Sequence, residues 1–198
     1  MDKDIINILQ DLQPKMKEKR FVHTCGVMFT AGNLAGFYGE DMNKALLAGA
    51  LHDCAKLQSI TDYLKECDAY GVSYSDEEKL TPHILHAPLG AYFAKEKYGV
   101  KDEDILHAIS VHTTGCEDMS MLDKIIYIAD YIEPSRGDED YLNEIRRLAY
   151  KDLDMAVYVA AEQVLYFLKD NGYAIDSKTV ETRDYYKNIV GGYDEYRK

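Results

Sequence analysis

Six residues able to bind a metal ion recur along this 198-residue chain in the order H…HD…H…H…D. They are His23, the adjacent pair His52 and Asp53, His86, His112 and Asp130. They lie at the ends of expected helices or inside apolar helical stretches, where a bare imidazole or carboxylate is costly without a partner. Metal ions are efficient partners for both groups, and a metal pair can hydrolyse phosphate esters.

Asp130 is the most informative member, because it follows the apolar run Ile125-Ile126-Tyr127-Ile128-Ala129 on a helix expected to be buried. Taken alone, such an Asp can equally be exposed or hydrogen-bonded to a neighbour. A lone His is more often structural than a ligand, and a single His-Asp dipeptide arises easily by chance. The combined order of the residues, rather than any one of them, predicts the metal site.

Several neighbouring side chains are candidates for binding phosphate. Lys56 follows Asp53 by three residues, so a continuing helical turn would bring its ammonium beside the metals. The other candidates are Arg20, Arg136, Thr113 and Thr114. The guanidinium groups suit phosphate oxygens. The threonine hydroxyls could donate to them, although a loop that ends a helix uses the same residues.

Two histidines fall outside the pattern. His83 lies three residues before His86, so it could contact substrate or compete with His86 as a ligand. His107 precedes His112 by five residues, which places it on a different face of the same helix. We expect His107 to be structural or exposed.

The elements that position these residues follow from apolar spacing. Helices are predicted around residues 5–12, 14–28, 42–56, 89–98, 103–112 and 121–133, with two short ones between 55 and 81 and two or three more from 141 to about 186. Side-chain caps are expected at Asp41, Ser59, Ser75, Asp102 and Ser120. No alternating strand pattern appears. The predicted fold class is all-α.

The bulk properties bound the class of protein. The length and the 46% hydrophobic content suit one globular domain. No run approaches the roughly 18 apolar residues of a membrane span, and a signal peptide is not evident, so we expect a cytoplasmic protein. Four cysteines without a CxxC pair signal neither a zinc site nor disulfides. A net charge of −12 opposes binding to a nucleic acid polymer.

The sequence resembles the HD-domain superfamily of metalloproteins, and more closely its YqeK-like group. The resemblance rests on HTCGV at residues 23–27, LHDCAK at 51–56, LHAPLGA at 85–91 and VHTTGCEDMSMLDKIIYIADYIEPSR at 111–136. It implies a helical bundle forming one HD domain over residues 1–198, with N-terminal and C-terminal helical extensions. It also implies a homodimer.

The resemblance assigns roles to the residues. His23, His52, Asp53 and Asp130 would bind one metal ion, and Asp53 would bridge to a second ion held by His86 and His112. The ions would be iron, with manganese or cobalt as alternatives. The implied activity is symmetrical hydrolysis of diadenosine tetraphosphate into two ADP by a metal-activated hydroxide. From position and side-chain chemistry we further expect Asp53 and Lys56 to be catalytic, and the residues that bind substrate to be Arg20, Lys56, His83, Thr113, Thr114 and Arg136.

Three alternatives stay open at this point. A metal pair could instead hydrolyse a mononucleotide, a cyclic nucleotide or another phosphodiester. Some proteins with this ligand order are di-iron oxygenases, against which the nearby cations argue weakly. A noncatalytic nucleotide-binding or scaffold module is the third alternative, and the complete ligand set argues against it.

Overall fold

The chain is described here by a computed structural model over residues 3–191, and this part contains ten α-helices and no strand. The helices are α1 (Lys3–Leu12), α2 (Glu18–Tyr38), α3 (Met42–Leu51), α4 (Tyr63–Tyr70), α5 (His86–Glu96), α6 (Glu103–Val111), α7 (Met121–Ile132), α8 (Asp140–Leu148), α9 (Leu153–Asp170) and α10 (Ser177–Val190). Short 3-10 segments are η1 (Gln13–Lys15), η2 (Glu78–Leu80), η3 (Pro82–Leu85) and η4 (Pro134–Arg136). The all-α prediction is confirmed.

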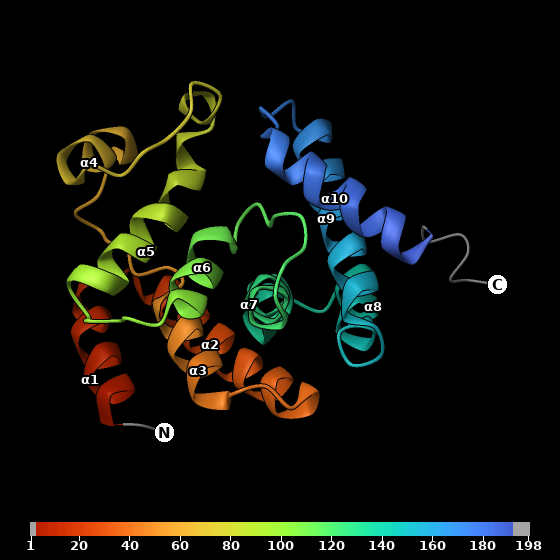
Figure 1. The fold of residues 1–198 in the computed structure, drawn as a ribbon, viewed down its shortest axis with the longest axis horizontal. Coiled ribbons are helices and arrows are strands. Elements are labelled where there is room, and N and C mark those ends of the chain that lie inside the picture. The colour runs from red at the N-terminus through yellow and green to blue at the C-terminus, as the bar shows by residue number, and fades with distance from the viewer. Residues whose placement is uncertain (1–2, 192–198) are drawn as a thin grey trace.

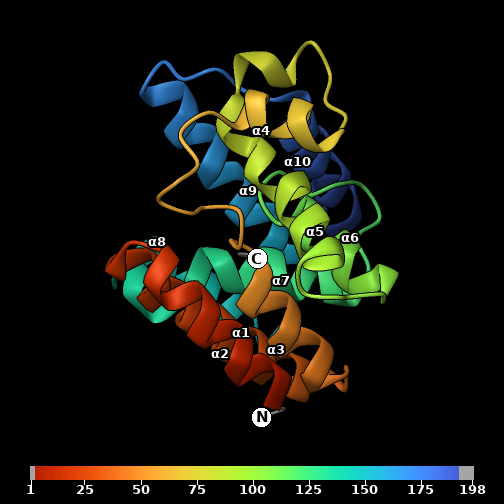
Figure 2. The ribbon, with the colours of Figure 1, turned by 90° about the vertical axis from the view of Figure 1, so that its left-hand side faces the viewer.

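Helix α7 is the centre of the bundle. It contacts α2, α3, α6, α8 and α9, and the view in Figure 1 runs along its axis. Figure 2 shows α1, α2 and α3 on one side of α7 and the blue helices α9 and α10 on the other. Its side chains Ile125, Ile126, Ile128 and Ala129 are completely buried. A helix that is apolar on nearly every face is one that neighbours enclose.

Helices α2 and α3 pack with their backbones almost in contact. A Cβ atom added at Gly49 of α3 would lie 2.8 Å from the Cα atom of Met28 in α2, so the approach requires glycine. Asp41 begins α3 by accepting hydrogen bonds from the backbone N–H groups of Asn43 and Lys44. The helix ends at Leu51, and a tight turn follows. A buried helix therefore delivers the next two residues, the His-Asp pair, into the interior.

Most predicted helix boundaries are confirmed by side-chain caps. Asp102 caps α6, and Ser120 begins α7 in a reciprocal capping box. Several details were wrong, among them the end of α3, which lies at Leu51 rather than near residue 56. Asp62 itself caps α4, in place of the box predicted from Ser59, because its carboxylate reaches the N–H of Lys65. Pro14 belongs to η1 rather than to the first turn of α2.

Helices α8, α9 and α10 complete the described part of the chain. Helix α9 packs on α7, α8 and α10, which joins the C-terminal helices to the central one. None of the helices within residues 3–191 is both long and apolar enough to cross a membrane. The single domain over residues 1–198 stays a prediction, and residues 1–2 and 192–198 lie outside the described residues.

The capping box of α7 can be tested by Ser120→Ala. The serine Oγ accepts from the N–H of Asp123 at 3.1 Å, and loss of such a cap costs about 0.5–2 kcal/mol. We expect the urea midpoint of unfolding to fall accordingly. Ser110→Ala is the control, because the Ser110 hydroxyl bonds only a carbonyl within α6. Equal midpoints for the two variants would show that the cap contributes nothing.

Candidate active site

The six residues of the predicted ligand set converge where five helices meet. His23 lies within α2, His52 follows the last residue of α3, His86 begins α5, His112 follows α6 and Asp130 lies in α7. Asp53 follows His52 in the turn after α3. Five of the six are at least 95% buried, and the side chain of Asp130 is 19% exposed.

One half of the cluster surrounds the Oδ2 atom of Asp53. The Nε2 atoms of His23 and His52 lie 3.8 Å and 3.4 Å from this oxygen. The Oδ1 atom of Asp130 lies 3.0 Å from His23 Nε2 and 3.9 Å from His52 Nε2. Two imidazoles and two carboxylates therefore face a common point.

The other half surrounds the Oδ1 atom of Asp53. The Nε2 atoms of His86 and His112 lie 3.5 Å and 3.6 Å from that oxygen. Asp53 is completely buried, yet its Oδ1 atom has no hydrogen-bond partner within the described residues. One carboxylate thus presents a different oxygen to each pair of histidines.

The far side of each imidazole is fixed by a hydrogen bond. The Nδ1 atoms of His52, His86 and His112 lie 2.5–2.7 Å from the carbonyl oxygens of Gly49, His83 and Ile109, respectively. A carbonyl can only accept, so Nδ1 carries the proton and Nε2 presents a lone pair to the cluster.

This tautomer makes the centre a set of acceptors. His86 Nε2 and His112 Nε2 are 3.1 Å apart, and His23 Nε2 and His52 Nε2 are 3.3 Å apart. Two lone pairs at such a distance repel one another unless a proton or a cation lies between them. Neutral imidazole nitrogens and carboxylate oxygens are also the donors that divalent transition metals accept. The donor set therefore fits a metal centre.

Three cations border the cluster. Arg20 donates to Asp53 Oδ2 at 2.6 Å, and the ammonium of Lys56 lies 3.1 Å from Asp53 Oδ1. Arg136 donates to Asp130 through its Nη2 atom at 2.5 Å. Burial disfavours the charged form of Asp53, but the cations beside it, Lys56 among them, outweigh burial and hold the pKa of this carboxyl well below its usual value. The carboxylate is therefore ionised at neutral pH.

A cavity of about 530 Å³ opens onto the cluster. Its wall includes the ligand candidates His112 and Asp130, the cations Lys56 and Arg136, and Thr113. This size is within the range of small-molecule sites, about 300–1,000 Å³. A substrate in the cavity would meet the acceptor cluster and two cations together.

Some of the remaining predicted residues lie at the cavity and others do not. His83 lines the cavity with an exposed side chain, while its carbonyl orients His86. The Thr113 hydroxyl lies 3.0 Å from His86 Nε2 and 3.1 Å from His112 Nε2. Thr114 is not brought to this cavity, because it lies in the turn after α6 and its hydroxyl donates to the carbonyl of Gly115. His107 is half-exposed and pairs with Asp123, as expected of a structural residue.

Glu133 is a site residue that the sequence analysis missed. Its Oε1 atom lies 2.9 Å from His23 Nδ1, so a carboxylate orients His23 where carbonyls orient the other three histidines. Glu133 is 1% exposed and also accepts hydrogen bonds from the N–H and hydroxyl of Ser135. A carboxylate behind a ligand histidine fixes the ring and raises its basicity. The available signal was an acidic residue directly before Pro134 at the end of an apolar helix.

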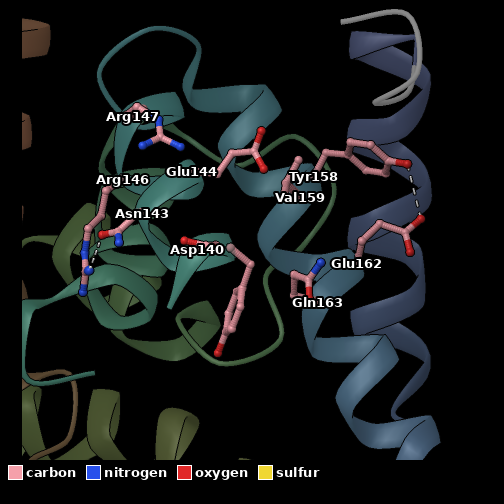
Figure 3. Close-up of a pocket in the computed structure, with 10 residues that line it drawn as sticks. Asp140, Asn143, Glu144, Arg146, Arg147, Tyr158, Val159, Glu162 and Gln163 are labelled. Atoms are coloured by element: carbon pink, nitrogen blue, oxygen red, sulfur yellow. Dashed lines mark hydrogen bonds between the residues drawn. The ribbon is translucent and has the colours of Figure 1, made fainter. Parts of the chain in front are cut away.

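A cavity of about 800 Å³ lies apart from this cluster, between α8 and α9 (Figure 3). Two of its charged groups already have partners. Arg146 donates to Asn143 and to the carbonyls of Ile132 and Glu133, and Glu162 pairs with Arg183. We assign this groove no chemistry. The hydrogen bonds of Arg146 connect α8 to the end of α7.

The chain belongs to the HD domain family, whose model matches residues 20–135. It is a hydrolase of this family, and the matched region contains His and Asp groups that could hold a metal ion.

Relatives with assigned activities cover nearly the whole chain. A protein of Halalkalibacterium halodurans, named symmetrical bis(5'-nucleosyl)-tetraphosphatase, is 40% identical over 88% of this chain and 92% of its own length. A Bacillus subtilis protein of the same name is 37% identical over 91% and 95%. A crystal structure from Clostridium acetobutylicum, described as a predicted HD superfamily hydrolase involved in NAD metabolism, matches with a TM-score of 0.87 and 40% identity over 92% of this chain and 96% of the other.

The packing of Glu133 against α2 can be tested by Gly26→Ala. An added Cβ would lie 2.3 Å from Glu133 Oε2, and three hydrogen bonds hold that carboxylate in place. We expect the free energy of unfolding to fall by about 1–3 kcal/mol, as for other overpacked sites. Urea denaturation measures it.

Gly36→Ala on the same helix is the matched control. Its Cβ would meet only Met42, with the sulfur at 3.5 Å, an ordinary contact. Replacing a helical glycine there should stabilise the protein by up to about 1 kcal/mol. A Gly26→Ala midpoint at or above that of Gly36→Ala would contradict the argument.

Proposed function

We propose that this protein hydrolyses dinucleoside tetraphosphates symmetrically, converting diadenosine tetraphosphate and water into two ADP. The observation that carries the proposal is the position of Asp53, buried between two pairs of histidines beside a cavity that contains Lys56 and Arg136. The near-full-length relatives named for this activity support the choice of substrate.

His23, His52, Asp53 and Asp130 would hold one divalent ion, and Asp53, His86 and His112 a second. Bound ions would supply a hydroxide at neutral pH and polarise a phosphoryl oxygen. The mixed imidazole and carboxylate set suits iron, manganese or cobalt, and iron is our choice because of the family resemblance.

The side chains around the cavity then have separate tasks. Lys56 and Arg136 contact the phosphate oxygens that do not react and offset the charge that develops on them. Arg20 and His83 are further candidates for binding phosphate. Thr113 is placed to donate its hydroxyl toward the cluster, whereas the position of Thr114 does not support the role predicted for it.

The bond changes of the proposed reaction balance without a further reactant. The oxygen of water bonds to one β-phosphorus, and the bond from that phosphorus to the central bridging oxygen breaks. The bridging oxygen leaves with the second ADP, and both protons of the water pass to solvent as the two ADP molecules ionise. ADP is a weakly basic leaving group, so no strong general acid is required.

Hydrolysis in ¹⁸O-labelled water tests this assignment. We expect ADP as the sole nucleotide product, with label in the β-phosphate of half of the ADP molecules. Chromatography and mass spectrometry of the products measure both. Release of AMP and ATP would rule out symmetrical cleavage, and oxygen consumption without nucleotide products would favour an oxygenase.

Metal removal should both inactivate and destabilise the protein. A ligand present at 100 times its dissociation constant stabilises the folded state by about 2.7 kcal/mol, so chelation should lower the melting temperature as well as abolish turnover. His112→Ala should reduce the metal content found by elemental analysis, while His107→Ala, on the neighbouring helix α6, should leave it unchanged. Full metal content in His112→Ala would remove that residue from the ligand set.

Two further expectations belong to this proposal. We propose that the protein acts in the cytoplasm and as a homodimer, as the family resemblance implies. Sedimentation or light scattering of the purified protein measures the oligomeric state.

A further inference from the structure

A second, apolar cavity adjoins the catalytic one. It has a volume of about 400 Å³, and its wall includes Leu80 and Thr81 on one side and Leu168 and Tyr173 on the other. His83 and Phe167 line both cavities, so the two adjoin at these residues. We call the second cavity the side pocket.

The side pocket differs from the catalytic cavity in charge. Among residues 3–191, no acidic side chain, lysine or arginine lines it, whereas Lys56, Asp130 and Arg136 line its neighbour. Phe167 and Tyr173 are more than half exposed, and their ring centroids are 6.0 Å apart. Exposed aromatic rings beside a cavity that contains a lysine and an arginine are suited to a ligand with a flat apolar end and an anionic end.

One polar group in the wall lacks a partner. Thr81 is 3% exposed, and its Oγ1 atom has no hydrogen-bond partner within the described residues. A buried hydroxyl without a partner costs free energy unless a ligand or water satisfies it. A purine carries hydrogen-bonding nitrogens around a flat ring, so it could pair with such a group while it stacks.

The two walls are held together by contacts between segments a hundred residues apart. Glu77 accepts hydrogen bonds from the N–H and hydroxyl of Ser177, both at 2.9 Å, and Lys178 pairs with Glu78 at 2.8 Å. Figure 1 shows the segment between α9 and α10 facing the segment that precedes α5. The side pocket is therefore formed by the fold before any ligand binds.

We infer that the side pocket binds the purine base of one half of the dinucleotide, with the ring on Phe167 and Tyr173 and the phosphates directed past His83 into the catalytic cavity. This inference rests on the proposed hydrolysis. In a dinucleoside tetraphosphate each base is two phosphates and a ribose away from the bond that breaks. Its binding site must therefore adjoin the metal cluster without belonging to it, as the side pocket does.

Binding of ADP and of pyrophosphate to the metal-loaded protein separates the base from the phosphates. Calorimetry of Phe167→Ala and Tyr173→Ala should show ADP binding weakened about five- to hundredfold, the range expected for one stacked base, and pyrophosphate binding within twofold of wild type. Phe167→Tyr should retain ADP affinity. Tyr166→Ala is the matched control, since Tyr166 is exposed on α9 and lines neither cavity.

Kinetics on diadenosine tetraphosphate provide the second readout. The alanine variants should raise KM by a similar factor and keep kcat within about threefold. The inference would be overturned if the alanine variants lost ADP and pyrophosphate binding equally, or if Tyr166→Ala weakened ADP binding as much as they do. A changed oligomeric state of the alanine variants in light scattering would also overturn it. A wild-type protein that binds ADP through Phe167 but leaves the tetraphosphate intact would instead contradict the proposed function.

Discussion

The site depends on one buried carboxylate that must face two ways. Asp53 is completely buried, and its two oxygens address different histidine pairs. An ionised group can be kept in such a place only if its surroundings repay the lost hydration. Arg20 and Lys56 do so in part, but the Oδ1 atom still lacks a hydrogen-bond partner within the described residues. The neighbouring helices must therefore provide the groups that stabilise the buried Asp53 carboxylate.

Most of the histidines around Asp53 lie at the ends of helices. His52 and His112 each follow the last residue of a helix and bond a carbonyl three residues back, a carbonyl near the open end of the same helix. His86 begins its helix and bonds the carbonyl of the 3-10 turn before it. Only His23 lies in mid-helix, where the backbone carbonyls are already used. That difference explains why His23 needs the carboxylate of Glu133.

The sequence was sufficient to predict the helical class, the six residues that converge around Asp53 and most helix starts, because each rests on chemistry visible in the sequence. Apolar spacing, the Ser120 cap and the His-Asp pair are visible in a short window. Glu133 depended on tertiary geometry, because it acts on a histidine 110 residues away, whereas the hydroxyl of Thr114 donates to the carbonyl of the next residue. The side pocket joins segments a hundred residues apart, which no local pattern encodes.

Charge explains how an acidic protein can hold a polyphosphate. The chain carries a net −12, so its overall field repels the proposed substrate. At the cluster the carboxylates of Asp53, Asp130 and Glu133 are matched by Arg20, Lys56 and Arg136, which leaves the protein groups close to neutral. Any excess positive charge must therefore come from bound divalent ions. If the ions are the main attraction for the phosphates, the apolar side pocket contributes a different kind of interaction. It can hold the base of a nucleotide by stacking and apolar contact, which the negative charge of the protein does not oppose.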